Sequence, residues 1–433
     1  MLNLMSNPRL DDAARLAEYA RFRAFFDGDQ WSSRPQHGEH RLTVNYARTL
    51  VRKVASYVFG GPLRYDVLPS GADDRIASRA ERELAAVIRA NNLDALDASL
   101  CITASVLGDA AMKITWDIAN RQPAVVAVDP AGLSVDTAPG MPHRIQRLFH
   151  TYAMTADQIA PTFAVDLPGI RMGNEATVSE IWTDAYWEVQ IDGVIVREEP
   201  NPFGWIPYVL VANNPRTDSI WGESDLVDLI AICREINSRM TVLSRVLEFS
   251  GAPIAVLENV EGADAIQVGP GAMWEIPEGS KAYLLDLLQG GGVGLHIEYI
   301  NLLYRSLHDL SETPRTAFGD SGRALSGAAL EVEIQPLVQK VRRKRQTWGG
   351  VHRERNRRLL DLLERFGGVD IGGLRETETI WPSVLPSDID SSVRNAVSLV
   401  GSGIQSRRTA WASLGGTDPE AELVRIREEA SAE

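Results

Sequence analysis

The sequence has 433 residues, of which 44% are hydrophobic, so it can bury a large core and is long enough for two or three domains. Its formal net charge of −14 argues against a protein that holds nucleic acid through bulk positive charge. Cys101 and Cys233 lack CxxC spacing, which argues against a disulfide scaffold or a zinc site and fits a reducing cytosol. The sequence does not open with the basic and then apolar stretch of a secretory signal peptide. No apolar run reaches the roughly 18 residues needed to cross a bilayer. We therefore expect a cytoplasmic protein with no membrane partner.

The first half of the chain predicts helices followed by strands. Hydrophobic periodicity and stop signals predict helices over residues 11–27, 43–59 and 73–90. From Cys101 onward the pattern becomes β-rich, with Pro, Gly and Asp between apolar runs. The expected strands cover residues 110–116, 124–128, 133–135, 145–152 and 178–196. Together these elements predict an α+β domain.

The middle of the chain predicts two helices with a small β insert between them. Apolar residues alternate at spacings of three and four, which is a heptad seam: Leu226, Leu229, Cys233, Ile236, Met240, Leu243 and Leu247. Ser224 is a suitable N-cap and Gly251 a stop, so a helix of about 26 residues, or roughly 39 Å, is expected. Short strands are predicted over residues 254–257, 272–276 and 281–287, and a returning helix over 296–310.

A short polar segment with two glycines, residues 316–323, follows the returning helix and predicts an exposed, mobile loop. Residues 326–366 are again helical in pattern, and Pro336 and Gly349-Gly350 predict a kink or break within them. Two helical stretches, residues 391–399 and 420–429, are expected near the end. Pro419 is a typical first helical residue for the second of them.

Four stretches, in this order, resemble the portal family of tailed bacteriophages, in particular its siphophage branch. They are Asn45-Tyr46-Ala47-Arg48 with Val58-Phe59-Gly60-Gly61-Pro62, then Gly222-Glu223-Ser224-Asp225-Leu226, then Ser326-Gly327-Ala328-Ala329-Leu330, and finally residues 400–409 with Asp418-Pro419-Glu420 and Arg425. The order and spacing of these stretches carry the resemblance, since each is short. Between residues 63 and 215 it rests on element type alone.

The resemblance implies an α+β portal fold made of wing, stem, clip and crown, which assembles as a ring. It implies this division of the chain: 1–221 wing, 222–250 first stem helix, 251–290 clip, 291–314 second stem helix, 315–327 tunnel loop, 328–384 long kinked helix and wing, and 385–433 crown. Such a subunit is not an enzyme and needs no cofactor.

The resemblance also implies the partners of such a subunit. About twelve copies form a ring channel at one capsid vertex, through which double-stranded DNA is packaged and ejected. The other expected partners are the terminase large subunit, the scaffolding and major capsid proteins, and a head-completion or adaptor protein. The location is then the virion, after assembly in the host cytoplasm.

Two groups of residues are candidates for contact with DNA or with a neighbouring subunit. The tunnel loop consists of Thr316, Ala317, Phe318, Gly319, Asp320, Ser321, Gly322 and Arg323. The basic cluster consists of Lys340, Arg342, Arg343, Lys344 and Arg345. For the cluster, a solvated helix face that pairs with acidic residues of the next subunit is favoured over DNA binding, because such residues usually make weak surface ion pairs. For the loop, a plain surface turn is the alternative.

Catalytic motifs are missing from the sequence. There is no phosphate-binding GxxxxGK[ST], no HExxH and no GxSxG or SxxK nucleophile. His352 is expected on the surface of a basic helix, and Asp66, Asp109 and Asp129 are expected in solvated or turn positions. The alternatives to a portal subunit are another oligomeric virion component, such as an adaptor or capsid protein, and a nucleic-acid-processing enzyme.

Overall fold

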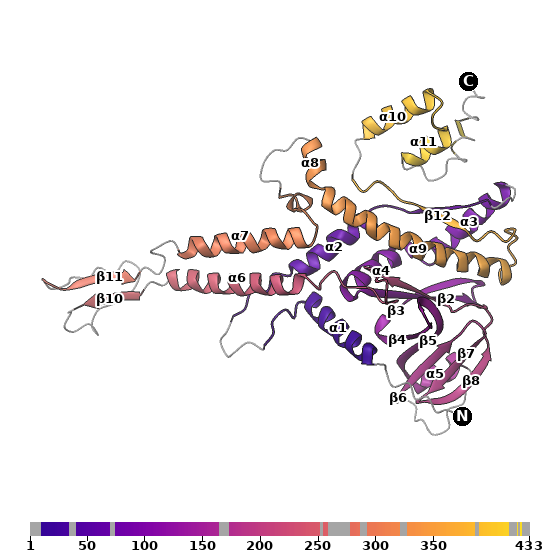
Figure 1. The fold of residues 1–433 in the computed structure, drawn as a ribbon, viewed down its shortest axis with the longest axis horizontal. Helices are drawn as coiled ribbons and strands as arrows, with labels where there is room; N and C mark the ends of the chain where they lie inside the picture. Colours follow the sequence, from indigo (N-terminus) through magenta and orange to yellow (C-terminus); the bar gives the residue numbers. More distant parts are fainter. Residues whose placement is uncertain are drawn as a thin grey trace. The chain divides into compact units, whose positions relative to one another are not determined.

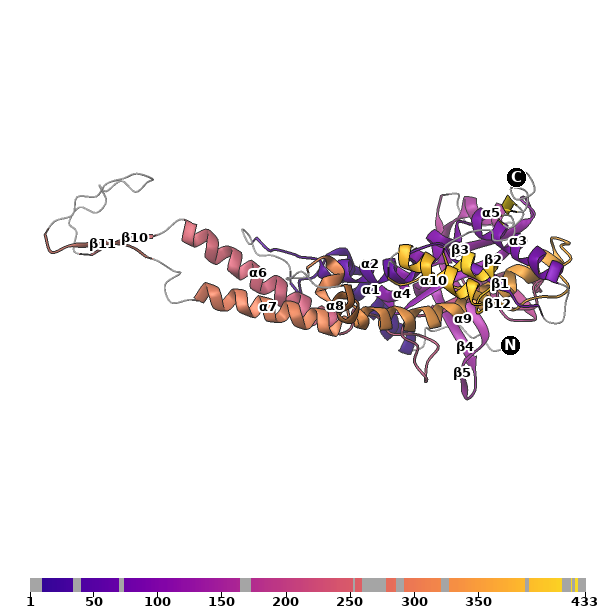
Figure 2. The same ribbon diagram turned by 90° about the horizontal axis from the view of Figure 1, so that it is seen from above.

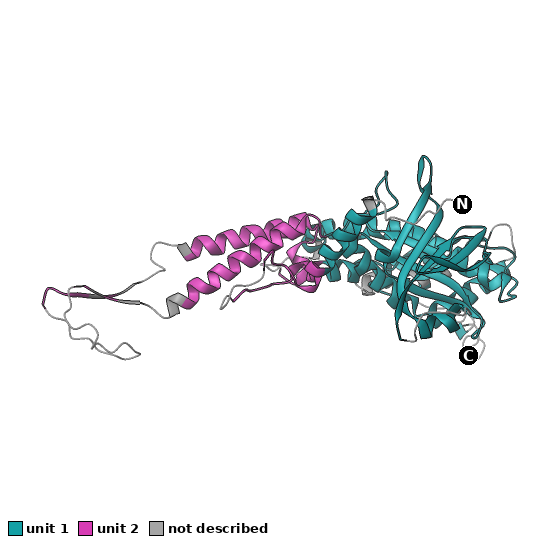
Figure 3. Cartoon of the chain, turned by 90° about the horizontal axis from the view of Figure 1, so that it is seen from below, with its two compact units in different colours: residues 1–23, 51–225, 323–433 teal, residues 24–50, 226–322 magenta. Residues whose placement is uncertain are grey.

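The computed structural model describes residues 10–33, 40–69, 74–163, 173–251, 254–258, 278–285, 292–320, 327–385 and 389–414, and residues 422, 425 and 426. Its mixture of helices and sheets confirms the α+β class. The chain divides into two compact units (Figure 3). Unit 1 holds residues 1–23, 51–225 and 323–433, and unit 2 holds residues 24–50 and 226–322. Each unit is described by itself.

The N-terminal helices agree with the sequence, with one addition. Helices α1 (Leu10–Asp27), α2 (Tyr46–Val58) and α3 (Asp74–Ala90) confirm the three predicted helices. The expectation of β structure from Cys101 onward is wrong, because Cys101 lies in a fourth helix, α4 (Leu93–Leu107). Polar residues lie on both the buried and the exposed side of this helix, with Asp97 and Ser105 inside and Asp94 outside, so the sequence shows no separate polar face.

Two antiparallel sheets follow α4 in unit 1 (Figure 1). A three-stranded sheet has the order β3-β2-β9, formed by β2 (Asp109–Asp117), β3 (Gln122–Val128) and β9 (Tyr208–Ala212). A five-stranded sheet runs in chain order through β4 (Leu133–Ala138), β5 (Met141–Thr155), β6 (Glu175–Trp182), β7 (Tyr186–Ile191) and β8 (Val194–Pro200). Helix α5 (Ala156–Phe163) packs Ile159 and Phe163 against the apolar side chains of β6 and β7. The predicted strand over 178–196 is therefore three strands.

The last part of unit 1 centres on a long helix. Helix α8 (Gly327–Glu333) ends at the predicted break before Pro336, and α9 (Gln335–Arg365) begins there. No break occurs at Gly349-Gly350, which lie within α9. Strand β12 (Thr377–Ile380) pairs with β1 (Arg64–Val67), and the chain then forms α10 (Ile389–Gly401) and α11 (Arg407–Ser413). Most of the predicted helix over 420–429 lies outside the described residues.

Unit 2 contains two helices and a strand pair. Helix α6 (Leu229–Gly251) packs against α7 (Gly292–Leu310), and the two lie side by side in both views (Figures 1 and 2). Strands β10 (Ile254–Glu258) and β11 (Lys281–Leu285) pair antiparallel. The seam is buried at its start and opens toward its end, since Cys233 is fully buried and Leu247 is 52% exposed. The predicted strand over 272–276 lies outside the described residues.

Candidate functional site

The predicted loop begins as a short helical turn, not as an exposed coil. Residues Arg315–Phe318 form a 3₁₀ helix, η3, and Gly319 ends it with a positive φ of 85°. Ala317 is buried, whereas Gly319 and Asp320 are exposed. The Arg315 guanidinium forms an ion pair with Asp320 across this turn. Ser321, Gly322 and Arg323 of the predicted tunnel loop lie outside the described residues.

Phe318 packs inside unit 2. Its ring meets the imidazole of His308 edge-to-face, with 5.4 Å between the ring centroids. His308 in turn contacts Tyr304 at 4.5 Å, and Tyr304 contacts Tyr46 of α2 at 5.2 Å. The four rings form a continuous row from α2 through α7 to η3, and such aromatic pairs each add about 0.5–1.5 kcal/mol beyond their buried area. The row fixes the start of the loop.

His308 contributes to this row as a neutral ring. Its Nδ1 lies 2.5 Å from the carbonyl oxygen of Thr313, so Nδ1 carries the hydrogen and donates it. Burial lowers the pKa of His308 below its ordinary value, because a charged imidazolium loses its hydration there. The segment that joins α7 to η3 is therefore held from within at neutral pH.

The basic cluster is not uniformly a solvated helix face. Arg342 and Arg343 are exposed and Lys340 is half-buried, but Lys344 is only 4% exposed and Arg345 only 8%. The Lys344 Nζ lies 2.7 Å from Asp225 Oδ2 and donates to Asn213 Oδ1 at 2.5 Å. The expectation of a surface position was therefore wrong for Lys344, which completes a buried ion pair within unit 1.

Asp225 is buried beside Lys344 and is fixed by its main chain as well. Burial alone would raise the pKa of this carboxyl, but the Lys344 ammonium outweighs it and holds the pKa below its usual range. The Asp225 N–H donates to the Ser105 carbonyl at 2.9 Å. The Ser224 hydroxyl donates to the Val106 carbonyl, so Ser224 does not cap α6 as the sequence predicted.

Arg345 is held by main-chain oxygens. Its guanidinium donates to the carbonyls of Val58 at 3.1 Å, Tyr57 at 3.1 Å and Pro382 at 2.6 Å, and it lies over the Trp381 ring at 5.0 Å. Three carbonyl partners and an aromatic face satisfy the planar cation inside the subunit. Arg345 therefore has a structural role.

His352 is buried, contrary to the expectation of a surface position. It is 0% exposed, with its Nε2 3.0 Å from Asp97 Oδ2. Arg355 donates to the same carboxyl oxygen at 2.7 Å and to the Tyr65 hydroxyl at 2.8 Å. Burial and the Arg355 cation lower the pKa of His352, so a neutral ring fills this position. These side chains join α9 to α4 and β1.

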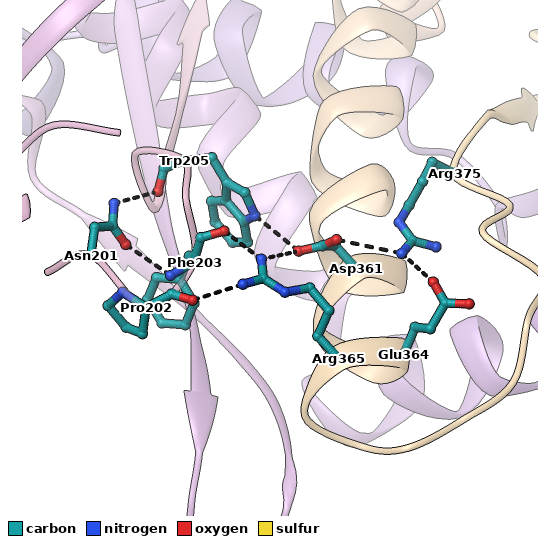
Figure 4. A network of polar contacts seen from close by, with 8 residues as sticks. All are labelled: Asn201, Pro202, Phe203, Trp205, Asp361, Glu364, Arg365 and Arg375. Carbon is teal, nitrogen blue, oxygen red and sulfur yellow. Dashed lines mark hydrogen bonds and ion pairs between the residues drawn. The ribbon is translucent and has the colours of Figure 1, made fainter. Parts of the chain in front are cut away.

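The C-terminal end of α9 is tied to a loop between β8 and β9 (Figure 4). Arg365 donates to the carbonyls of Phe203 at 2.5 Å and Pro202 at 2.9 Å. Asp361 pairs with Arg365 at 3.1 Å and accepts from the Trp205 indole at 3.1 Å. Basic and acidic residues along α9 thus serve to attach the helix to the rest of unit 1.

The burial of two further carboxylates was not predicted from the sequence. Asp109, expected in a solvated or turn position, is 2% exposed, accepts from the Gly222 N–H at 2.8 Å, and has its pKa raised to about 6 by burial. Glu180 accepts from Lys113 Nζ at 2.6 Å and from the Tyr152 hydroxyl at 2.9 Å. In β6, Glu180 alternates with the buried Ala176, Val178 and Trp182, and this period of two is a signal of its burial, whereas Asp109 at the start of β2 has no such local signal. Asp66 and Asp129 are exposed, as expected.

Metal-ligating side chains do not gather into a metal site in the part of the chain that the structure describes. Among the described residues, no group of three or more His, Cys, Asp or Glu side chains is arranged to hold a metal ion. Both cysteines are buried, and burial raises the pKa of each thiol to about 12. No described helix is both long and apolar enough to span a membrane.

Comparison with known proteins gives one finding of similarity. A family model described as phage portal protein, SPP1 Gp6-like, matches residues 11–433, which is nearly the full chain. A search of curated proteins found no matching sequence. The matched family is structural rather than catalytic, and membership implies a ring-forming component of the phage capsid. The chain therefore belongs to the SPP1 Gp6-like family of phage portal proteins and has a portal role in a phage virion.

Proposed function

We propose that about twelve copies of this chain form a closed ring that serves as the DNA channel at one capsid vertex, during packaging and again during ejection. The observation that carries the proposal is unit 2, in which the packed pair α6 and α7 is interrupted by the strand pair β10 and β11. Paired rods joined through a small sheet suit stacking around an axis, where each copy makes one head-to-tail contact on either side.

Each part of the chain takes a role that a ring channel requires. Helices α6 and α7 are the stem, and the segment from 251 to 290, which holds β10 and β11, is the clip. The clip is the surface for the terminase large subunit and later for a head-completion protein. The sheets of unit 1 and α9 form the wing, the surface for scaffolding and capsid proteins. Helices α10 and α11 belong to the crown.

The negative charge of the chain suits a channel that lets DNA pass rather than a site that binds DNA tightly. Each copy carries a formal charge of −14, and each firm Lys or Arg contact with phosphate would add affinity through counterion release. Lys344 and Arg345 are buried and internally paired, so the basic cluster offers fewer cations to DNA than its sequence suggests. Weak attraction lets a duplex slide.

Only the part of the tunnel loop that follows Phe318 is proposed to touch DNA. Ala317 is buried and Phe318 is held by His308, so both belong to the anchor of the loop. Gly319 and Asp320 are the first exposed residues. The DNA-facing part of the loop is therefore assigned to residues 319–323.

Native mass spectrometry of the purified full chain tests the proposed ring. The expected result is an assembly of about twelve subunits of 47.6 kDa each. A species that stays monomeric at all concentrations would contradict a ring-forming subunit.

A further inference from the structure

Unit 1 contains an open groove along one face of α9 that the portal role has not used. Its volume is about 830 Å³, and its opposite wall is the segment from Glu378 to Leu385. The apolar part of the lining includes Val338, Trp381 and Leu385. Each of these residues lies within unit 1.

Two unpaired cations flank the middle of this groove. Arg342 and Arg353 are exposed, and neither guanidinium has a hydrogen-bond or ion-pair partner among the described residues. They stand 11 residues apart on one helix, which corresponds to roughly 16 Å. Glu378 is the single acidic residue among those that line the groove, so the lining keeps a positive excess.

Between the two arginines, part of the groove floor is bare main chain. Gly349 and Gly350 lie there, and a Cβ placed on either would meet nothing within 4 Å. Glycine permits close approach of another backbone. A helix laid along α9 can therefore come near its axis between the two cations.

We propose that this groove receives residues 418–429 of a neighbouring copy of this chain. Residues 415–433 carry six acidic side chains against two basic ones, so the segment complements the arginines. The sequence predicts a helix over residues 420–429, and residues 422, 425 and 426 are helical. Ile426 is 44% exposed and supplies an apolar contact.

The spacing of the two partners matches. On α9 the groove face carries Arg342, Gln346, Gly349 and Arg353, at offsets of 4, 7 and 11 residues. A helix that begins at Pro419 carries Glu422, Ile426 and Glu429 on one face, at offsets of 4 and 7 from Glu422, and Asp418 directly precedes its first residue. Laid antiparallel, Asp418 meets Arg353 and Glu429 meets Arg342, while Ile426 faces Gln346.

The neighbouring copy, and not the same chain, is assigned as the donor because a ring contact is heterologous. In such a contact one face of a subunit meets a different face of the next, so the groove of one copy can receive the C-terminal segment of its neighbour. This inference rests on the proposed ring, since the ring brings a second copy to the groove in a fixed register.

Disulfide trapping in the full chain tests the proposal. The double variant Gln346→Cys and Ile426→Cys is oxidised after assembly, and products are separated without reductant. The native Cys101 and Cys233 are 1% and 0% exposed, so they contribute little background. The expected result is a ladder of covalently linked subunits. The matched control, Ile118→Cys with Ile426→Cys, uses a residue that is 83% exposed and outside the groove, and should give no ladder.

Charge reversal provides the second readout. Arg353→Glu is expected to lower the trapping yield roughly threefold to fivefold, as for loss of an exposed ion pair, and Asp418→Arg in the same chain should restore it. A disulfide within one chain, or no disulfide in assembled rings, would overturn the docking and leave the ring itself standing. Absence of any assembly would count against the proposed ring instead.

Discussion

The Nζ of Lys344 lies 2.7 Å from the Oδ2 of Asp225, and the two side chains are only 4% and 6% exposed. Lys344 is on α9, whereas Asp225 precedes α6 in sequence by a few residues. The pair therefore fixes the last residues of unit 1 before the chain enters unit 2. A buried pair of this kind gives little net stability over an apolar pair, but its two charges depend on each other.

Replacement of Lys344 by Met is expected to destabilise the fold by about 3–5 kcal/mol, because Asp225 is left buried without its cation. The measurement is denaturant unfolding of the full chain, from which the midpoint and the m-value are determined. The control is Gln339→Met, at an exposed position of the same helix outside the groove, which should change stability by less than about 0.5 kcal/mol. Equal effects of the two substitutions would show that the Lys344–Asp225 pair is not a stabilising contact.

Removal of the Asp225 charge as well should recover part of the stability that Lys344→Met loses. In the double variant Lys344→Met with Asp225→Asn, no charge remains buried at this position. We expect it to be more stable than Lys344→Met alone by about 1–3 kcal/mol. A double variant no more stable than the single one would mean that packing, and not charge, sets the cost.

Phe318→Ala is expected to loosen the loop base without disturbing the rest of unit 2. The ring is half-buried against His308, so the loss should be about 1–3 kcal/mol, less than the roughly 3–5 kcal/mol typical of a fully buried Phe. Hydrogen exchange should accelerate at residues 315–320, while α6 keeps its protection. The control Val332→Ala removes a side chain that is 71% exposed, and it should change neither the stability nor the hydrogen exchange of residues 315–320. Unchanged exchange in Phe318→Ala would contradict the anchor.

Deletion of residues 319–322 is expected to spare the fold, because it leaves the buried Ala317 and the packed Phe318 in place. In a phage that depends on this chain, particles should form with normal portal content but contain less DNA. The measurement is the DNA content of purified particles. Removal of 317–322 should be more damaging to folding, since it takes the anchor as well.

The stability of the chain should depend on pH through Asp109. Its carboxyl has a pKa raised to about 6 by burial, against an ordinary value of 3.8, so the folded state holds the proton more firmly than the unfolded state. Stability therefore falls as pH rises from about 4 to 6, and the penalty persists above that window. Asp109→Asn should remove this dependence and gain about 2 kcal/mol over the parent chain between pH 4 and pH 7.

The matched control for Asp109 is Asp66→Asn, a change at an exposed carboxyl in β1. Thermal midpoints measured between pH 4 and pH 7 should run parallel for this variant and the parent chain. Parallel curves for Asp109→Asn as well would contradict the assignment of this titration to Asp109.

Elements with a clear polar face were predictable, whereas the buried polar contacts were not. The periodicity of α2 and α3 and the heptads of α6 showed which residues face a core. Helix α4 was missed because its buried side includes the polar Asp97 and Ser105, so apolar and polar residues do not separate into two faces. Ser224 has the side chain of an N-cap but donates to a carbonyl more than a hundred residues away, and such a partner has no local signature.

The burial of Lys344 and His352 had a signal that was read incorrectly. Both fall at helical spacing with the apolar Val341, Trp348 and Leu359, that is, on the buried face of α9. A cation at a seam position predicts an internal carboxylate partner, since a lone buried charge is too costly. Which carboxylate it is depends on the tertiary fold, and Asp97 and Asp225 are both remote in sequence.

Copies of this chain are proposed to surround an open passage for DNA. Cryo-electron microscopy of the purified full chain tests this proposal most directly. The expected map is a ring of about twelve subunits with cyclic symmetry, in which α6 and α7 of successive copies surround a hole wide enough for a duplex. Particles without a through-hole, or with α6 and α7 on the outside of the assembly, would contradict it.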